Sequence, residues 1–481
     1  MADQLLVNMD RLRTIFGDRC VTDHDKTLSR FSTDQVGDDA YAQLPIAVVS
    51  PTTTDEVVEL MRWANETGVP ITPRGAGSGL AGAAIPAAGG VVCSFALMNR
   101  ILEIDTDNLM VVVEPGVVTN ALDKALEPHG LFFAGYPMSE DICFIGGNVA
   151  ENAGGGRAIK YGVTAGYVLG AEVVTPTGEV LHLGGKRLKD VTGYNLLQLF
   201  VGSEGTLGLL TSITLRVIPR PARRGVSLFG FEKAVDAVGC VRALRSNPLV
   251  VPSSIEFMDG PTARETNEAM PEAARSSLPD RADAFLLVEV DGDEGVESEL
   301  RAAAATASEH GGMLIESGTD AETAERAWKL RKQIPWFVKR RAGPYHSLED
   351  VVVMPAGVAR LVDFVASLRE RLQIPIAVFG HAGDGNFHVT PMKPEAMNPT
   401  EWRSLVDGLL HELYREVVSM GGTISGEHGI GRKRVKYLAE IVEPSHLAAM
   451  RAVKSVFDPN GVMNPGVMLE AWPARGADAP S

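Results

Sequence analysis

Three runs of this 481-residue chain are too rich in glycine to form ordinary core helices or strands. They lie at 73–82, 136–162 and 201–208, and the centre of the second run, 146–156, holds five glycines and two asparagines. Glycine weakens the interior of a helix or a strand, and it lets a backbone approach another group closely. The centre of the second run therefore predicts a backbone that closely approaches a large flat ligand.

The first run contains Gly77-x-Gly79-x-x-Gly82, which is the spacing of a dinucleotide-binding turn. That fingerprint needs a clean strand before it and a helix that opens from its last glycine. Pro70 and Pro73 interrupt the strand, and Pro86 with the following glycines leaves no room for a helix. We therefore expect an irregular loop whose bare N–H groups can hold a phosphate. The alternative is a flexible surface linker.

After the proline- and arginine-rich stretch at 219–224, glycine clusters become few and predicted strands alternate with helices. Before it, we expect two helices, one capped by Thr53 and one over 120–128 with Thr119 as N-cap. The strands expected in this part lie at 46–50, 69–72, 91–95, 102–105, 110–114, 169–175, 179–183 and 209–217. After it, strands at 226–231, 254–258, 284–290, 313–316 and 351–354 alternate with helices at 233–246, 294–309, 321–341, 357–371 and 400–420. This order predicts a mostly antiparallel sheet with helices on one face.

A predicted hairpin over 374–390 carries two histidines. Asp384-Gly385 is a strong two-residue turn signal, because that turn needs positive φ. With the turn on those two residues, His381 pairs with His388, and their Cβ atoms lie roughly 5 Å apart. Such a pair suits one metal ion with nitrogens at roughly 2.1 Å. The alternative is two partly exposed histidines that flank a hairpin.

Glu427 and His428 lie in a glycine-rich stretch, 422–431, and strengthen the interpretation of the hairpin as part of a site. Arg331 lies in the expected helix at 321–341, within a basic stretch. From its position alone, Arg331 is either an anion-binding group or an exposed helix arginine.

Composition excludes several classes of protein. The net charge of −16 disfavours nucleic acid and anionic membrane surfaces as partners. Four scattered cysteines indicate neither a disulfide framework nor an iron–sulfur or zinc–thiolate site. No signal peptide or membrane span is visible, so we expect a cytoplasmic protein of two or three domains.

These motifs together resemble the FAD-linked oxidoreductases of the vanillyl-alcohol-oxidase flavin fold. The similar branches are the catalytic subunit of glycolate oxidase, D-lactate dehydrogenase and D-2-hydroxyglutarate dehydrogenase. The resemblance covers about 40 to 466 and rests on Pro-Arg-Gly-x-Gly-x-Gly at 73–79, Ile-Gly-Gly-Asn-x-Ala-Glu-Asn-Ala-Gly-Gly at 145–155, Lys-Tyr-Gly at 160–162, Val-Gly-Ser-Glu-Gly-Thr-Leu-Gly at 201–208, Gly-His-Ala-Gly-Asp-Gly-Asn-x-His at 380–388, Gly-Glu-His-Gly-Ile-Gly at 426–431 and Asn-Pro-Gly at 464–466.

The resemblance implies an α+β fold in three parts. A two-subdomain PCMH-type FAD-binding domain would span 1–222, and a ferredoxin-like antiparallel-sheet cap domain for the substrate would span 223–422. A C-terminal segment, 423–481, would return to the FAD domain and complete the active site.

The resemblance also implies which residues hold FAD. The first loop would hold the pyrophosphate, and the other two runs would wrap the flavin and adenosine ends. No histidine occurs at 73–82, where relatives with covalent flavin often carry one, so non-covalent FAD is expected. The implied contacts are Pro73, Arg74, Gly75, Ala76, Gly77, Ser78, Gly79, Leu80, Pro137, Asp141, Ile142, Gly146, Gly147, Asn148, Asn152, Gly154, Gly155, Glu204, Gly205, Gly208 and Asn464.

For the chemistry, the resemblance implies His381, His388 and Glu427 as ligands of a divalent metal. Zn²⁺ is the first choice, and Mn²⁺ or Fe²⁺ are alternatives. His428 would be the base, and Arg331 would bind the substrate carboxylate. Thr390 and Pro335 stand where the hydroxyglutarate branch usually has Asn and Thr, which argues against a C5 diacid as substrate.

The expected activity is oxidation of a D-2-hydroxy acid, such as D-lactate or glycolate, to the 2-oxo acid. Electrons would leave through electron-transfer flavoprotein, an iron–sulfur subunit or a quinone, and a homodimer is the oligomer considered. The alternatives are D-2-hydroxyglutarate dehydrogenase, a flavin oxidase of another alcohol, and a non-catalytic flavin subunit that relays electrons.

Overall fold

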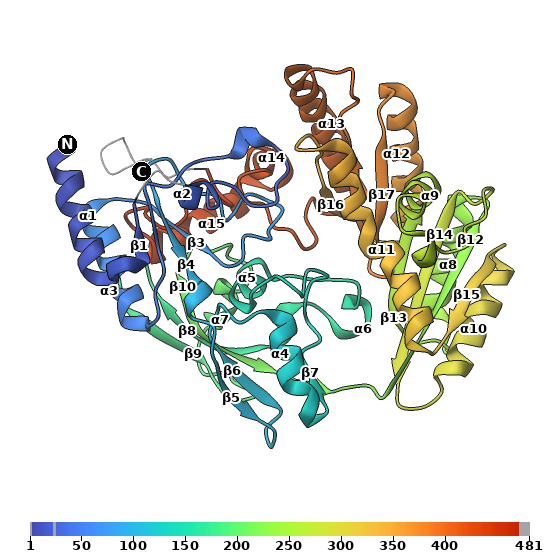
Figure 1. Cartoon of the computed structure of the whole chain (residues 1–481), viewed down its shortest axis with the longest axis horizontal. Helices are drawn as coiled ribbons and strands as arrows, with labels where there is room; N and C mark the ends of the chain where they lie inside the picture. The colour runs from blue at the N-terminus through green and yellow to red at the C-terminus, as the bar shows by residue number, and fades with distance from the viewer. Residues whose placement is uncertain (1, 23–25, 471–481) are drawn as a thin grey trace. The chain divides into compact units, whose positions relative to one another are not determined.

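The computed structural model describes residues 2–22 and 26–470. The chain forms two compact units (Figure 1). The first unit comprises 1–153, 163–219 and 427–481, and the second comprises 154–162 and 220–426. The chain therefore passes between the units several times, and the segment 154–162, which includes the predicted flavin contacts Gly154 and Gly155, belongs to the second unit.

The first sheet of the first unit has the order β1-β2-β4-β3. Its strands are β1 (Cys20–Val21), β2 (Ala47–Val49), β3 (Ile71–Arg74) and β4 (Val91–Ser94), and both β2 and β3 run parallel to β4. Helix α3 (Thr54–Thr67) connects β2 to β3. As predicted, the Thr53 hydroxyl caps α3 by accepting from the N–H of Glu56, and Gly68 ends the helix with φ of 72°.

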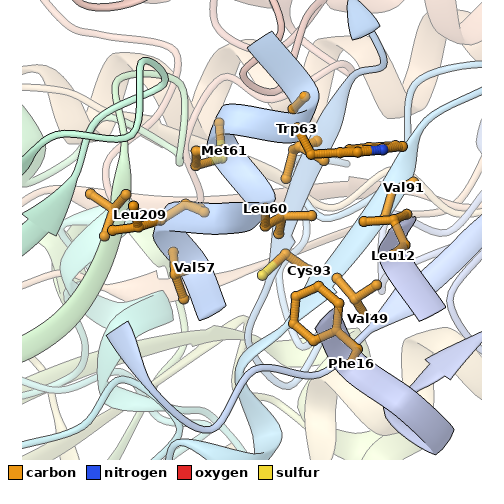
Figure 2. Packing of buried hydrophobic residues seen from close by; sticks show 14 of the residues in the cluster. Leu12, Phe16, Val49, Val57, Leu60, Met61, Trp63, Val91, Cys93 and Leu209 are labelled. Atoms are coloured by element: carbon orange, nitrogen blue, oxygen red, sulfur yellow. The ribbon is translucent and has the colours of Figure 1, made fainter. Parts of the chain in front are cut away.

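Helix α3 buries its apolar face in the core of this unit. Leu60 and Trp63 are fully buried and pack with Val49 and Val91 from the sheet (Figure 2). Phe16, at the end of α1 (Ala2–Phe16), belongs to the same cluster. Ile71 of β3 belongs to this cluster too, so the capped helix packs with the strand that leads into the first glycine-rich loop.

The second sheet of the first unit is antiparallel, with the order β5-β6-β10-β8-β9 (Figure 1). Its strands are β5 (Ile101–Asp105), β6 (Met110–Val113), β8 (Val168–Val174), β9 (Val180–Gly184) and β10 (Leu209–Arg216). Two short strands, β7 (Leu131–Phe132) and β11 (Ile218–Pro219), form a separate ribbon. The remaining helices of this unit are α2 (Lys26–Ser29), α4 (Thr119–Leu126), α5 (Ile145–Glu151), α7 (Leu197–Phe200), α14 (Val435–Ile441) and α15 (Pro444–Phe457).

Two sequence predictions in this region were wrong. The central glycine run was interpreted as too poor for a helix, yet its first half forms α5. The N–H groups of Ile145 and Gly146, at the start of α5, donate to the carbonyls of Val117 and Pro115, so tertiary contacts support this short helix. Thr119 is the first residue of α4 rather than its N-cap, which is Val118.

The C-terminal segment of the described chain joins the first sheet. Met463 forms a parallel bridge with Ile71, and the buried Lys454 ammonium donates to Asp458 and to the carbonyls of Thr206 and Met463. The segment therefore connects the third glycine run, at Thr206, to β3, the strand that leads into the first run.

The second unit is built on a seven-stranded sheet with the order β15-β12-β14-β13-β17-β18-β16, and every pair is antiparallel. The strands are β12 (Arg223–Phe231), β13 (Pro252–Asp259), β14 (Ala284–Gly292), β15 (Met313–Gly318), β16 (Glu349–Val352), β17 (Ile376–His381) and β18 (Asn386–Pro391). Its helices are α6 (Ala158–Tyr161), α8 (Ala234–Ser246), α9 (Gly260–Glu268), α10 (Val296–Glu309), α11 (Ala321–Ala342), α12 (Val358–Leu372) and α13 (Pro399–Ser419).

Helices cover both faces of this sheet, so the prediction of helices on one face was wrong. Arg331 of α11 bonds to Glu256 on one face. Leu300 of α10 packs at Gly225, and the strand register places Gly225 on the opposite face. The central strands are consequently buried on both sides, which makes polar residues on them unusual.

We expect Leu60→Ala to destabilise the first unit by about 2–5 kcal/mol, because it removes a fully buried side chain and leaves a cavity. Urea unfolding followed by circular dichroism checks this value. The matched control is Leu188→Ala at a 69% exposed position, which should change stability by less than about 0.5 kcal/mol. Equal effects of the two substitutions would contradict the described core.

Candidate active site

The two histidines of the hairpin lie on the same buried sheet face. His381 ends β17 and lies opposite Asn386, while His388 of β18 lies opposite Phe379. The turn therefore contains four residues, 382–385, and the predicted pairing of His381 with His388 was wrong by two positions. A register shift of two residues leaves both side chains on the same face of the sheet. The two imidazole rings therefore still meet edge to face, with centroids 5.4 Å apart. Their exposures of 3% and 5% exclude the alternative of partly exposed histidines.

A buried carboxylate holds one of these rings. Glu256 of β13 lies opposite His381, and its oxygens are 2.8 and 2.9 Å from His381 Nδ1. This contact directs Nδ1 to the carboxylate and leaves Nε2 as the nitrogen for another partner. A carboxylate behind the histidine ring is the usual arrangement around metal-binding histidines.

Glu256 also binds Arg331 on α11. The Arg331 Nε donates to Glu256 Oε2 at 2.7 Å, and both side chains are almost fully buried. Burial alone would raise the pKa of Glu256, but His381 and Arg331 outweigh it, and the pKa lies below its usual value. Arg331 is thus not an exposed helix arginine.

The outer part of Arg331 has unused donor capacity. Its Nη2 is buried and has no hydrogen-bond partner among the described residues, and the guanidinium carbon lies 5.1 Å from the centroid of the Phe379 ring. The Oγ1 of Thr390, on β18, is also buried without a partner in the described chain. A polar ligand would satisfy both groups.

Asp350 of β16 organises the other side of the hairpin. It lies opposite His388, and its Oδ1 is 3.9 Å from His388 Nδ1. Its carboxylate accepts from the Asn386 side chain at 2.7 Å, and from the Ser425 hydroxyl and the Gly426 N–H at 2.9 Å each. The carboxylate therefore fixes the chain up to Gly426.

Glu427 and His428 follow directly after that fixed point. The Cα atoms of Gly426 and Glu427 are joined by one peptide unit and so lie about 3.8 Å apart. The side chains of Glu427 and His428 are mostly buried, and His428 Nε2 lies 3.4 Å from Glu427 Oε1. The predicted ligand and base thus continue a segment that Asp350 holds.

Most of the residues of the predicted FAD loops lie in the first unit. Gly75 of the first loop faces Gly147 of α5 so closely that a Cβ on Gly75 would lie 3.8 Å from the Gly147 Cα. Around Gly147 itself a Cβ would meet only open space. Two glycine backbones that adjoin beside open space fit a flat cofactor.

Several predicted cofactor contacts shape the loops through their side chains. Arg74 donates to the carbonyls of Thr33 and Ala84, and a Cβ on Gly77 would overlap its guanidinium. Asn148 donates to Thr119, and Asn464 donates to the carbonyls of Ala83 and Glu204 while its Oδ1 is buried without a partner in the described chain.

The other predicted cofactor residues differ in their exposure and in the unit to which they belong. Ile142 is 51% exposed, Asp141 is exposed and bonds to Asn120, and Asn152 accepts from the N–H of Ala165. Gly154 and Gly155 belong to the second unit, unlike the rest of the set. The remaining members lie in the first unit: Pro73, Ala76, Ser78, Gly79, Leu80, Pro137, Gly146, Glu204, Gly205 and Gly208.

Comparison with known proteins identifies the family. The model for "FAD linked oxidases, C-terminal domain" matches residues 220–468, and the model for "FAD binding domain" matches 45–184. This chain belongs to the FAD-linked oxidase family. It is 38% identical over 432 residues to glycolate oxidase subunit GlcD of Bacillus subtilis, which covers 89% of this chain and 90% of that protein. It is 35% identical over 426 residues to D-lactate dehydrogenase of Anaerostipes hadrus, covering 88% and 89%.

The fold of this FAD-linked oxidase matches p-cresol methylhydroxylase with a TM-score of 0.80 over 98% of both chains, at 19% identity. The predicted fold class, a PCMH-type FAD-binding domain with a cap domain, is therefore confirmed. An FAD-binding oxidoreductase is likewise confirmed at the level of the family. Among the described residues no helix is both long and apolar enough to cross a membrane.

The sequence interpretation missed Glu256. A signal for Glu256 existed, because Ser254 and Glu256 alternate with Ile255 and Phe257 and so predict a strand with one polar face. No sequence pattern showed that this face meets His381, which lies 125 positions away.

We expect Glu256→Ala to destabilise the second unit by about 3–5 kcal/mol, because it leaves the buried Arg331 without its counter-charge. The apolar double variant Glu256→Leu with Arg331→Met should lose less than that single variant. Urea unfolding measures both. Glu370→Ala, at an exposed position on α12, is the control and should be close to neutral. A double variant that loses as much stability as Glu256→Ala, or more, would contradict the pairing.

Proposed function

We propose that this protein is an FAD-dependent, metal-assisted dehydrogenase that oxidises a D-2-hydroxy acid to the 2-oxo acid. One observation carries the proposal: His381 Nδ1 is held by Glu256, so that Nε2 is presented on the sheet face shared with His388. His381, His388 and Glu427 would hold a divalent ion, with Zn²⁺ first and Mn²⁺ or Fe²⁺ as alternatives. A bound ion would act as a Lewis acid on the substrate hydroxyl and carboxylate.

The reaction removes a proton from the hydroxyl and a hydride from Cα, and it leaves a ketone. His428 takes the proton as a neutral imidazole. The partnerless Nη2 of Arg331 donates to the substrate carboxylate. The glycine loops would hold FAD non-covalently, and FAD would supply the hydride acceptor.

The substrate we propose is short, in the manner of D-lactate or glycolate. Phe379, opposite His388, offers an aromatic ring, and Thr390, two residues beyond His388 on β18, offers one hydroxyl. The hydroxyl of Thr390 is a weaker partner for a second carboxylate than a charged group would be. D-2-hydroxyglutarate is therefore the alternative substrate.

A bound flavin would pass its electrons to a protein or quinone acceptor. The four cysteines are all buried and scattered, which does not suit an internal iron–sulfur centre. One relative is named as a subunit of glycolate oxidase, which supports a partner protein such as an iron–sulfur subunit or electron-transfer flavoprotein. Dye acceptors can replace that partner in assays of the chain itself.

Anaerobic addition of D-lactate, glycolate, D-2-hydroxyglutarate and longer D-2-hydroxy acids tests the activity. We expect at least one short acid to bleach the visible absorption band of the flavin, with D-2-hydroxyglutarate slower. Bleaching by none of them would refute the proposed function. A yellow, metal-free protein that no acid reduces would instead indicate an electron-relay subunit.

His388→Ala tests the metal. We expect loss of bound metal and a fall in turnover of about 100-fold or more, while the flavin spectrum stays unchanged. Elemental analysis and steady-state kinetics measure the two effects. His182→Ala, with a side chain 76% exposed on β9, is the matched control and should retain both metal and turnover. Normal turnover of His388→Ala would show that His388 is not a ligand.

A further inference from the structure

Glu204, in the third glycine run, has an unusual backbone. Its φ is 51°, in the left-handed region, and it is 4% exposed. That conformation costs a residue with a side chain about 1–2 kcal/mol. Such strain persists only where the surrounding structure fixes it, and it concentrates at functional sites. Glu204 is therefore held in place for a reason beyond the turn itself.

The Glu204 carboxylate binds the loop that follows His428. Oε1 accepts from the N–H of Ile430 at 2.7 Å, and Oε2 accepts from the N–H of Gly431 at 2.6 Å. The backbone of Glu204 is fixed as well. Its N–H donates to the Ala150 carbonyl at 2.7 Å, and its carbonyl accepts from Asn464 at 3.0 Å. The residue thus joins α5 and the C-terminal segment to this loop.

The loop at 429–431 is tightly packed around the Glu204 carboxylate. Gly429 and Gly431 have φ of 84° and 55°. A Cβ on Gly431 would overlap the Ala81 carbonyl, and a Cβ on Gly429 would overlap a carboxylate oxygen of Glu151. The guanidinium of the buried Arg434 donates back to the Gly429 carbonyl at 2.9 Å. The loop is accordingly pressed between two carboxylates and the first glycine run.

The two carboxyl groups beside the loop, those of Glu204 and Glu151, both have raised pKa values. Burial raises the pKa of Glu204 to about 7, and the two backbone N–H donors and Arg434 act against the rise. Burial and the charges of Glu204 and Asp34 raise the pKa of Glu151 further. Of the two neighbouring carboxylates, Glu204 is the one that the loop's N–H groups stabilise as an anion.

We propose that Glu204 is a positioning residue: its carboxylate fixes the backbone at 430–431 and thereby the placement of Glu427 and His428. This inference rests on the proposed function, in which those two residues act as ligand and base. The sequence-based assignment of Glu204 as a cofactor contact stays a prediction beside this one.

Glu204→Gln tests the proposal, because an amide can accept one N–H but places an NH₂ group against the other. We expect flavin bleaching by the best 2-hydroxy acid to slow by about 10–100-fold, as for a small misplacement of a catalytic group. FAD content and the KM for the acceptor dye should stay at wild-type values. The control Glu179→Gln alters an exposed glutamate and should change nothing. Gly429→Ala should reproduce the defect, since its Cβ displaces the loop.

A second readout does not depend on turnover. Hydrogen exchange of the holoprotein should show slow exchange for the amides of Ile430 and Gly431, and clearly faster exchange in Glu204→Gln. Wild-type bleaching and wild-type protection in the variant would overturn the proposal, and so would loss of FAD or of folding, which would make Glu204 a general structural or cofactor residue. If the wild type reduces no 2-hydroxy acid, the proposed function fails, and amide exchange alone decides whether Glu204 fixes the loop.

Discussion

A single buried carboxylate holds the candidate active site together. Glu256 lies inside a strand that is covered on both faces, where an ion without partners would be very costly. It is stable there because His381 and Arg331 reach it from a neighbouring strand and from α11. The same contacts determine which histidine nitrogen is available and where the partnerless Arg331 Nη2 lies. The chemistry we propose therefore depends on a polar row built across the middle of a sheet.

The two units differ in the residues that shape their predicted binding regions. In the first unit, glycines bring backbones together around open space, and side chains such as Arg74, Asn464 and Glu204 fasten one loop to another. In the second unit, strand register places charged side chains on one face. The first arrangement suits the FAD that the family binds, and the second would suit the ion and the small acid that we propose. This division explains why glycine clusters are dense before residue 219 and sparse after it.

Much of the fold could be predicted, because long apolar periods and capping residues such as Thr53 act locally. The hairpin was misplaced in register because Asp384-Gly385 marks a turn without giving its length, and the shift of two spared the face of both histidines. Helix α5 could not be predicted, because Val117 and Pro115 supply the bonds that support its glycines. The partnership of Glu256 with His381 needed the order β13-β17, which only the folded sheet provides.

Anomalous X-ray scattering from crystals of the metal-loaded enzyme tests the central claim most directly. We predict one divalent ion per chain with His381 Nε2 and His388 among its ligands at about 2.1 Å, and with Glu256 behind His381 rather than on the ion. An ion bound elsewhere, or one that Glu256 ligates in place of His381, would contradict this claim.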